Sequence, residues 1–221
     1  MVMGELMATH TDILTLTQWF SPAFPVGAFA YSHGLEWAID AGDVVDAQTT
    51  RAWVQSVLNS GAGRNDAILL AQAYLANSDE DLQEVEATCR ALASSKERLM
   101  ESRLQGDAFC ATTSAIWANA LTGLSYPVAV GRAAHLEGLP LDLTAQMYLQ
   151  SFMSNLISAA MRLVPLGQIE GQTLIRELTP LCASVAAKAT TGSLDDLGSS
   201  AFMSDIAAMK HETQYSRIFR T

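Results

Sequence analysis

Apolar residues recur at intervals of three and four along almost the whole chain, from Thr11 to Met209. That spacing matches the turn of an α-helix, whereas a half-buried strand would alternate at every second residue. Proline, glycine and capping residues divide the pattern into segments of helical length. The sequence therefore predicts an all-α fold, a single compact domain of about eight to ten helices that spans residues 1–221.

Residues that cap or end helices set the expected boundaries of these helices. Serine, threonine and aspartate are favoured just before a helix, glycine just after one, and proline in its first turn. Residues 1–10 carry no recognisable pattern and are expected to be flexible. The expected helices cover about 11–20, 32–41, 46–60, 65–76, 95–121, 127–137, 142–163 and 171–188, with one more after Ser78 and a last one from Ser204.

Composition narrows the class of protein. Apolar residues make up 49% of the chain and charged residues only 16%, so part of the surface is expected to be covered by partner proteins. Thirteen basic and twenty-three acidic residues give a net charge of −10. Proteins that bind nucleic acid on their own usually carry a positive charge. DNA and RNA are therefore not expected as partners.

The cysteines and the apolar stretches bear on the cellular compartment. Cys89, Cys110 and Cys182 lie far apart, without a Cys-x-x-Cys pair, which fits a reducing cytoplasm. No lysine or arginine precedes Arg51, so a secretory signal is not expected. The most apolar long stretch, 143–163, contains Gln, Asn and Arg residues that a bilayer centre disfavours. The sequence predicts a cytoplasmic protein without a membrane span.

Two segments near the ends of the chain are unlike ordinary helices or connections. Residues 21–36 (SPAFPVGAFAYSHGLE) contain two prolines and two glycines, which break regular structure, together with aromatic and histidine side chains. Residues 211–220 (HETQYSRIFR) place aromatic and arginine side chains where many chains end on small polar residues. These two segments are the strongest candidates for a functional role.

Catalytic and metal-binding motifs are weak in this chain. There is no Gly-Lys dipeptide, so a P-loop is absent and nucleotide hydrolysis is not expected. The four histidines lack the short spacings typical of metal ligands. His33 and Glu36 stand three residues apart and could share an ion on one helical face, which leaves a helical metal-binding protein as one alternative. Stable metal binding by this pair alone is not expected.

The segment Ala30-Tyr-Ser32-His-Gly34 differs from the hydrolase elbow G-x-S-x-G only in its first residue. That elbow requires a parallel β-sheet, and the chain lacks the alternation of strands and helices that builds one. Ser32 is better interpreted as the N-cap of the following helix. A serine hydrolase built on Ser32 is therefore the other alternative, and no catalytic residue is expected.

The C-terminal segment has its own charge and apolar pattern. Tyr215, Ile218 and Phe219 would form a narrow apolar stripe if the segment were helical. From Lys210 to Arg220 three basic residues and one acidic residue give a charge of +2 in an otherwise acidic chain. Tyrosine and arginine are enriched among residues that anchor protein interfaces. Two interpretations stay open: a last helix docked on its own domain, or an exposed tail that binds a partner.

These motifs resemble the UreF family of urease accessory proteins. The resemblance is carried by Ser21-Pro22, Pro25-Val-Gly27, Tyr31-Ser32 and Gly34-Leu-Glu36 in the first segment, by Glu101-Ser-Arg103 with Gly106, by Pro127-Val with Gly131, by residues 159–168 with Gly171-Gln172, and by His211 to Arg220. It covers about residues 14–221. Ala30 departs mildly, because serine is more usual there, and Ile218 stands where leucine is common.

The resemblance implies a urease maturation factor that is not an enzyme. It would act as a chaperone-like homodimer, bind the accessory protein UreD (also called UreH), recruit the GTPase UreG and assist nickel insertion into apo-urease. Nickel would pass through the complex without a cofactor bound stably to this chain. The partner-binding residues expected from the two motifs are Tyr31, Ser32, His33, Glu36, His211, Glu212, Gln214, Tyr215, Ser216, Arg217 and Arg220; Pro25, Gly27, Gly34 and Gly167 are expected to set backbone geometry.

Overall fold

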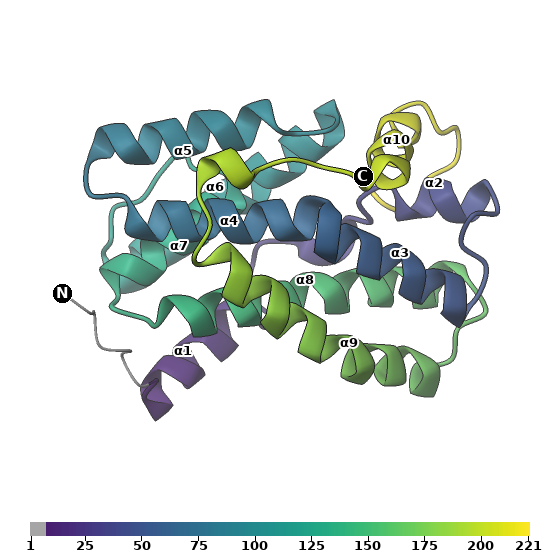
Figure 1. Ribbon diagram of the computed structural model, residues 1–221, viewed down its shortest axis with the longest axis horizontal. Helices are drawn as coiled ribbons and strands as arrows, with labels where there is room; N and C mark the ends of the chain where they lie inside the picture. Colours follow the sequence, from purple (N-terminus) through teal and green to yellow (C-terminus); the bar gives the residue numbers. More distant parts are fainter. Residues whose placement is uncertain (1–7) are drawn as a thin grey trace.

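A computed structural model describes residues 8–221 of the chain, and its regular structure is helical throughout (Figure 1). No strand occurs in this range, so the prediction of a single all-α domain is confirmed. The α-helices are α1 (His10–Trp19), α2 (Leu35–Asp40), α3 (Ala47–Ser60), α4 (Ala62–Leu75), α5 (Asp79–Ala91), α6 (Lys96–Trp117), α7 (Tyr126–Leu136), α8 (Leu141–Leu163), α9 (Gln168–Ala189) and α10 (Phe202–His211), with short 3-10 turns η1 (Ala28–Ala30) and η2 (Leu194–Asp196).

Several helix ends differ from those expected. Helix α1 begins at His10, because Thr9 and Asp12 form a capping box, so it starts within the segment expected to be flexible. Residues 1–7 lie outside the described part of the chain. Helix α4 begins at Ala62, three residues earlier than expected. Helix α6 stops at Trp117, four residues earlier than expected, where the chain turns into a left-handed conformation.

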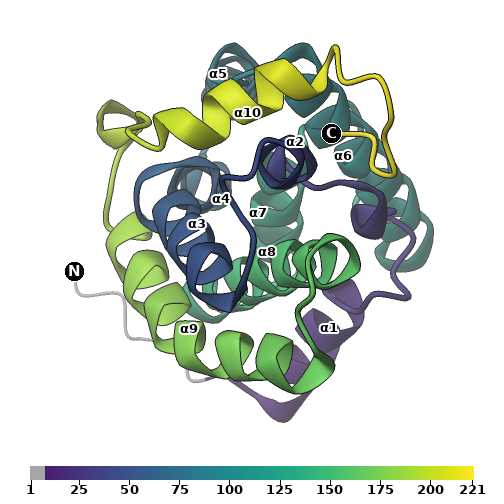
Figure 2. The same ribbon diagram turned by 90° about the vertical axis from the view of Figure 1, so that its right-hand side faces the viewer.

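Helix α8 occupies the middle of the bundle, as its sequence predicts. It contacts α1, α2, α3, α4, α7 and α9, and Figure 2 shows it surrounded by neighbouring helices. Its side chains Leu149, Met153, Leu156 and Ile157 are completely buried. Fully burying one aliphatic side chain of this size contributes about 1.5–3 kcal/mol. This helix therefore supplies much of the apolar core on which the rest of the domain is arranged.

Glycine allows two of the closest helix crossings. A Cβ atom on Gly131 of α7 would overlap the carbonyl oxygen of Leu70 in α4. A Cβ atom on Gly106 of α6 would overlap the carbonyl oxygen of Leu124, just before α7. Backbones approach this closely only where a side chain is missing. The packing of α4 and α6 against α7 therefore depends on these glycines.

Helix α10 lies across α2 at one end of the domain (Figure 2). The first turns of α6 reach the same end and contact α10. The C-terminal residue is placed beside these elements, far from α1 in the view of Figure 1. The two unusual sequence segments, although about 190 residues apart in the chain, therefore meet in space. Within the described range, no helix combines the length and hydrophobicity that a membrane crossing requires.

Candidate functional site

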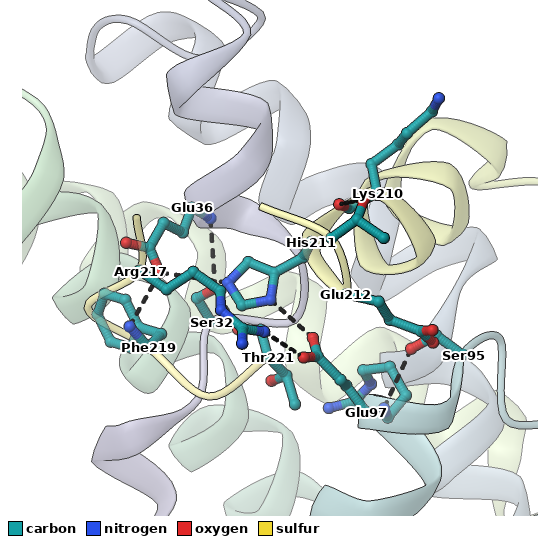
Figure 3. Close-up of polar contacts among 12 residues, drawn as sticks. Ser32, Glu36, Ser95, Glu97, Lys210, His211, Glu212, Arg217, Phe219 and Thr221 are labelled. Carbon is teal, nitrogen blue, oxygen red and sulfur yellow. Dashed lines mark hydrogen bonds and ion pairs between the residues drawn. The ribbon is translucent and has the colours of Figure 1, made fainter. Parts of the chain in front are cut away.

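The C-terminal segment leaves the helix at His211 and returns over α2 in an irregular path (Figure 3). Phe219 and Thr221 are buried, while Tyr215 and Ile218 are exposed. The expected helical stripe of Tyr215, Ile218 and Phe219 is therefore wrong, because residues 212–221 are not helical and these side chains point to different environments. The segment docks on its own domain, yet it keeps part of its apolar surface in solvent.

The carboxylate of Glu36 holds the returning segment. Its Oε1 accepts a hydrogen bond from the backbone N–H of Ile218 at 2.7 Å, and its Oε2 accepts one from that of Phe219 at 2.9 Å. The same Oε2 lies 3.2 Å from Nε2 of His211. Glu36 is only 6% exposed. A buried carboxylate requires such partners, because losing its hydration is costly. These groups form the centre of what we call the C-terminal clasp, defined by Glu36, Glu97, His211, Arg217 and Phe219.

Glu97, in the first turn of α6, completes the clasp from the other side. Its Oε2 lies 2.7 Å from Nδ1 of His211, and its Oε1 accepts a hydrogen bond from Nη1 of Arg217 at 2.5 Å. His211 is fully buried and has a carboxylate oxygen at each ring nitrogen. The clasp thus joins α2, α6, α10 and the returning segment through one histidine.

The last residues also pair with the segment before α2. The N–H and Oγ of Ser32 both donate to the main-chain oxygen of Thr221, at 2.8 and 2.5 Å. The N–H of Arg220 donates to the carbonyl of Ala30 at 2.8 Å. Ser32 is therefore not the N-cap of α2, a position that Gly34 takes. Its hydroxyl instead donates to Thr221 and accepts from the N–H of Glu36 at 3.3 Å. No strand precedes it in the described chain, so the structure gives the hydrolase alternative no support.

A second polar cluster lies directly beneath the clasp. Glu101 accepts hydrogen bonds from Thr221 Oγ1 at 2.8 Å and from Gln105 Nε2 at 2.9 Å, and it pairs with Arg98 and with Nε2 of His33. Burial alone would raise the pKa of Glu101, but the charge of Arg98 and the contact with His33 outweigh it and lower the pKa to about 2. Glu101 is therefore ionised at neutral pH, and burial together with Arg98 lowers the pKa of His33.

This inner cluster surrounds a cavity of about 40 Å³, whose wall also includes Asp66, Tyr126, Tyr148 and Asn155. Tyr148 donates a hydrogen bond to Asp66 at 2.9 Å. Burial raises the pKa of Asp66 to about 6, although the nearby Arg98 partly opposes the shift. His33 and Glu36 point to different partners, Glu101 and His211, and so do not form the shared pair considered from their spacing. Within residues 8–221, no three or more His, Cys, Asp or Glu side chains are placed to hold a metal ion.

The remaining residues expected at the site differ in exposure. Tyr31, Ser32, Glu36 and His211 are buried within this chain, whereas Tyr215, Ser216, Arg217 and Arg220 are exposed. Glu212 accepts a hydrogen bond from the N–H of Lys96 and so caps α6. Gln214 is half-buried. Binding of a partner by any of these residues stays a prediction; the buried ones act here on the chain itself.

The four residues expected to set backbone geometry act differently. Gly27 and Gly34 have φ angles of 71° and 77°, in the left-handed region that favours glycine. Gly167 has a φ of −71° and is the N-cap of α9, where its N–H donates to Glu170. Pro25 is exposed and lies in a turn in which the N–H of Val26 donates to the carbonyl of Phe24. Only the first two require a conformation that other residues rarely adopt.

Comparison with known proteins places the chain in a family. The family model for UreF matches residues 44–179. The urease accessory protein UreF of Ruegeria pomeroyi is 61% identical over 217 residues, which cover 97% of this chain and all of that protein. The chain belongs to the UreF family. The UreF proteins of Roseobacter denitrificans and Rhodopseudomonas palustris are 55% and 46% identical, covering 99% and 97% of this chain and 98% and 94% of their own lengths.

In this UreF-family chain the family model includes Glu97 of the clasp but neither of the two terminal segments that meet there. It begins after residues 21–36 and ends before residues 211–220. The relatives that align over nearly the whole chain do cover both segments. The clasp therefore belongs to the part that full-length relatives share. It provides a rigid, buried base and an exposed rim with apolar and basic side chains, an arrangement suited to binding another protein.

A substitution at Asp66 tests the electrostatics of the inner cluster. Because its pKa is higher in the folded chain than the ordinary 3.8, the folded state binds the proton more tightly than the unfolded state does. Stability should therefore fall as pH rises from about 4 to about 6. Asp66→Asn, which keeps an acceptor for Tyr148, should be more stable than wild type at pH 7.5 by about 2 kcal/mol and about equal to it near pH 4.

Urea denaturation of both proteins at pH 4.5 and 7.5 would measure this difference. The exposed Asp107, on the outer face of α6, provides the matched control as Asp107→Asn. We expect the control to show no such gain. A stability difference for Asp66→Asn that is the same at both pH values would contradict the assignment, because an effect of packing alone does not depend on protonation.

Proposed function

We propose that this chain is a urease maturation factor. It acts in the cytoplasm as a chaperone-like homodimer, binds UreD/UreH, recruits the GTPase UreG and assists nickel insertion into apo-urease. The observation that carries the proposal is 61% identity over the full length of a relative named urease accessory protein UreF. Nickel is cargo in this proposal and is handled transiently by the complex. The chain itself performs no catalytic step.

The clasp supports this proposal by its division into two faces. Its inner face fixes the C-terminal segment through Glu36 and Glu97. Its outer face leaves Tyr215 fully exposed and Arg220 in solvent. A tyrosine side chain offers a large, rigid aromatic area and an arginine offers a planar fork of five donors, so both are effective anchors. We assign this outer face to the GTPase or to the second protomer.

Complementation of a strain that lacks its own UreF gene tests the function. The wild-type chain should restore urease activity in the presence of nickel and should copurify with UreD and UreG. Tyr215→Ala combined with Arg220→Ala should weaken recruitment of one partner at least tenfold, since anchor residues typically contribute about 2 kcal/mol each. The fold should be unaffected, because both side chains are exposed.

The control variant is Ile169→Ala, which removes another highly exposed apolar side chain from the start of α9. It should leave assembly and activation unchanged. If the wild-type chain fails to restore urease in the presence of all other accessory proteins, the proposed function is wrong. If the double variant assembles and activates normally, the function stands but the outer face of the clasp is not the partner surface.

A further inference from the structure

Helix α10 carries large apolar side chains on the side that faces away from the domain. Phe202, Met203, Ile206 and Met209 are 66%, 52%, 43% and 53% exposed. Because successive helical residues are turned by about 100°, these four and the exposed Lys210 lie on one face of the helix, centred on Ile206. Figure 2 shows α10 at the edge of the domain, lying across α2. We call these five residues the α10 stripe.

The opposite face of α10 is already packed. Ala207, Ala208 and His211 are buried where the helix contacts α2 and α6. A helix that is apolar on both faces is normally enclosed by other elements. Single apolar side chains on a surface are ordinary, but four on one face of a helix of 10 residues form a continuous strip. A strip of this kind marks a surface that binds another protein.

The shape of the stripe fits another helix. Phe202, Ile206 and Met209 follow the i, i+4, i+7 spacing with which one helix packs against a second. An added β-strand would need unpaired backbone N–H and C=O groups, which the middle of a helix does not offer. The side chains alone therefore make the contact, and a partner helix with its own apolar face is the element that covers them.

The charges near the stripe favour an acidic partner. Lys210 belongs to the stripe, and from Lys210 to Arg220 the chain carries +2 against −10 overall. The neighbouring carboxylates already have partners in this chain. Asp205 accepts a hydrogen bond from Oγ of Ser199 at 2.6 Å, and Glu212 accepts one from the first N–H of α6. A carboxylate of the partner beside the stripe would therefore be attracted to this locally basic end of the chain.

A second copy of the chain is the rival occupant, because the stripe is nearly symmetric about Ile206. In an antiparallel pair related by a two-fold axis, Met203 and Lys210 of both copies would lie along one side of the contact. Phe202 and Met209 would lie along the other. The two lysines would thus share a side on which the stripe has no carboxylate, and two chains of net charge −10 repel each other. A different protein with an acidic flank fits better.

We propose that the α10 stripe binds an amphipathic helix of a partner protein, with apolar side chains over Ile206 and a carboxylate beside Lys210. The stripe is distinct from the outer face of the clasp, because Tyr215 and Arg220 follow the end of α10. The contact goes beyond the proposed role in urease maturation. Its test does not depend on that role, so either can fail while the other holds.

Titration of the full chain with two synthetic helices tests the proposal. Both probes are stapled peptides of about four turns with leucine on one face. One carries glutamate beside the leucines, and the other carries lysine there. Binding is followed by NMR at the methyl groups of Met203, Ile206 and Met209. At low salt the glutamate helix should bind at least about tenfold more tightly than the lysine helix, and added salt should reduce this difference.

Two pairs of variants separate the apolar contact from the charge. Ile206→Ser should weaken binding of the glutamate helix about tenfold or more, because it removes the centre of the stripe. Ile169→Ser, which truncates a highly exposed side chain on α9, is its control and should bind as wild type does. Lys210→Glu should abolish the preference for the glutamate helix. Lys188→Glu, at an exposed position on α9, should retain it.

Sedimentation velocity of wild type, Ile206→Ser and Ile169→Ser tests the rival occupant. The proposal predicts the same oligomeric state for all three. It is overturned if Ile206→Ser dissociates a dimer that Ile169→Ser leaves intact, because the stripe would then bind a second copy. It is also overturned if neither helix binds saturably, if both helices bind alike, or if Ile206→Ser binds the glutamate helix as tightly as wild type does.

Discussion

Replacing Glu36 with alanine should release the C-terminal segment from the domain. The carboxylate accepts the N–H groups of Ile218 and Phe219 and contacts His211, so its loss leaves two backbone donors without acceptors and removes a partner of the buried imidazole. Each unpaired buried donor costs about 1–3 kcal/mol. The docked conformation should therefore lose about 3–5 kcal/mol, enough to make the undocked state the major one. The bundle formed by α3 to α9 should remain folded, because its core does not include Glu36.

Hydrogen exchange at Ile218 and Phe219 measures this loss directly. Both amides should exchange at least a hundredfold faster in Glu36→Ala than in wild type. Asp40→Ala, an exposed substitution on the same short helix, is the control and should not change either rate. If the segment presents a partner surface, urease activation should be lost in Glu36→Ala and kept in Asp40→Ala. Unchanged protection of both amides would show that Glu36 does not hold the segment.

Much of the fold could be predicted because the spacing of apolar residues indicates which side chains are buried. The central position of α8 follows from a sequence that is apolar around more than half of its circumference. Helix ends were harder to predict. The turn after Trp117 places Ala118 at a φ of 56°, a conformation that alanine rarely adopts, so no residue there indicates a stop. The start of α4 at Ala62 was missed because its N-cap, Gly61, lacks a capping side chain.

Only part of the candidate site could be predicted from the sequence. The two terminal segments were recognisable, but their contact with α6 was not. In the sequence, Glu97, Arg98 and Glu101 look like the solvated charged first turns of a helix, yet Glu101 is only 2% exposed. The spacing of Arg98, Glu101 and Gln105 by three and four residues was a usable signal of a polar stripe. What it pairs with depends on tertiary contacts that spacing does not contain.

The polar residues of the two motifs resemble a partner-binding site in the sequence, but in the structure most of them stabilise the clasp. Most of the polar residues in the two motifs satisfy one another across the junction of α2 and the returning segment. Their polar groups form hydrogen bonds within the chain, and these bonds fix the backbone of residues 212–221. The residues that can contact another protein are those left between these inner contacts, such as Tyr215 and Arg220. The conformation of this surface thus depends on the buried residues of the clasp.

Replacing Gly34 with alanine should disrupt the same region by a different route. Gly34 has a φ of 77°, and an added Cβ would lie 2.7 Å from the carbonyl carbon of Ala207 and closer still to the nitrogen of Ala208. These are backbone atoms of α10, which cannot move aside without lifting the helix from α2. We expect the free energy that stabilises α10 against α2 to fall by more than about 3 kcal/mol. About 1 kcal/mol of this loss comes from placing alanine in a left-handed backbone conformation.

Gly27→Ala separates the two contributions, because Gly27 has nearly the same φ, 71°, but open space around its Cβ position. It should cost only about 1 kcal/mol. Hydrogen exchange in α10 and urea denaturation of both variants give the comparison. If Gly27→Ala and Gly34→Ala lose equal stability, backbone conformation alone explains both. A larger loss in Gly34→Ala, together with faster exchange in α10, means that the close approach of α10 to α2 is what positions His211 for the clasp.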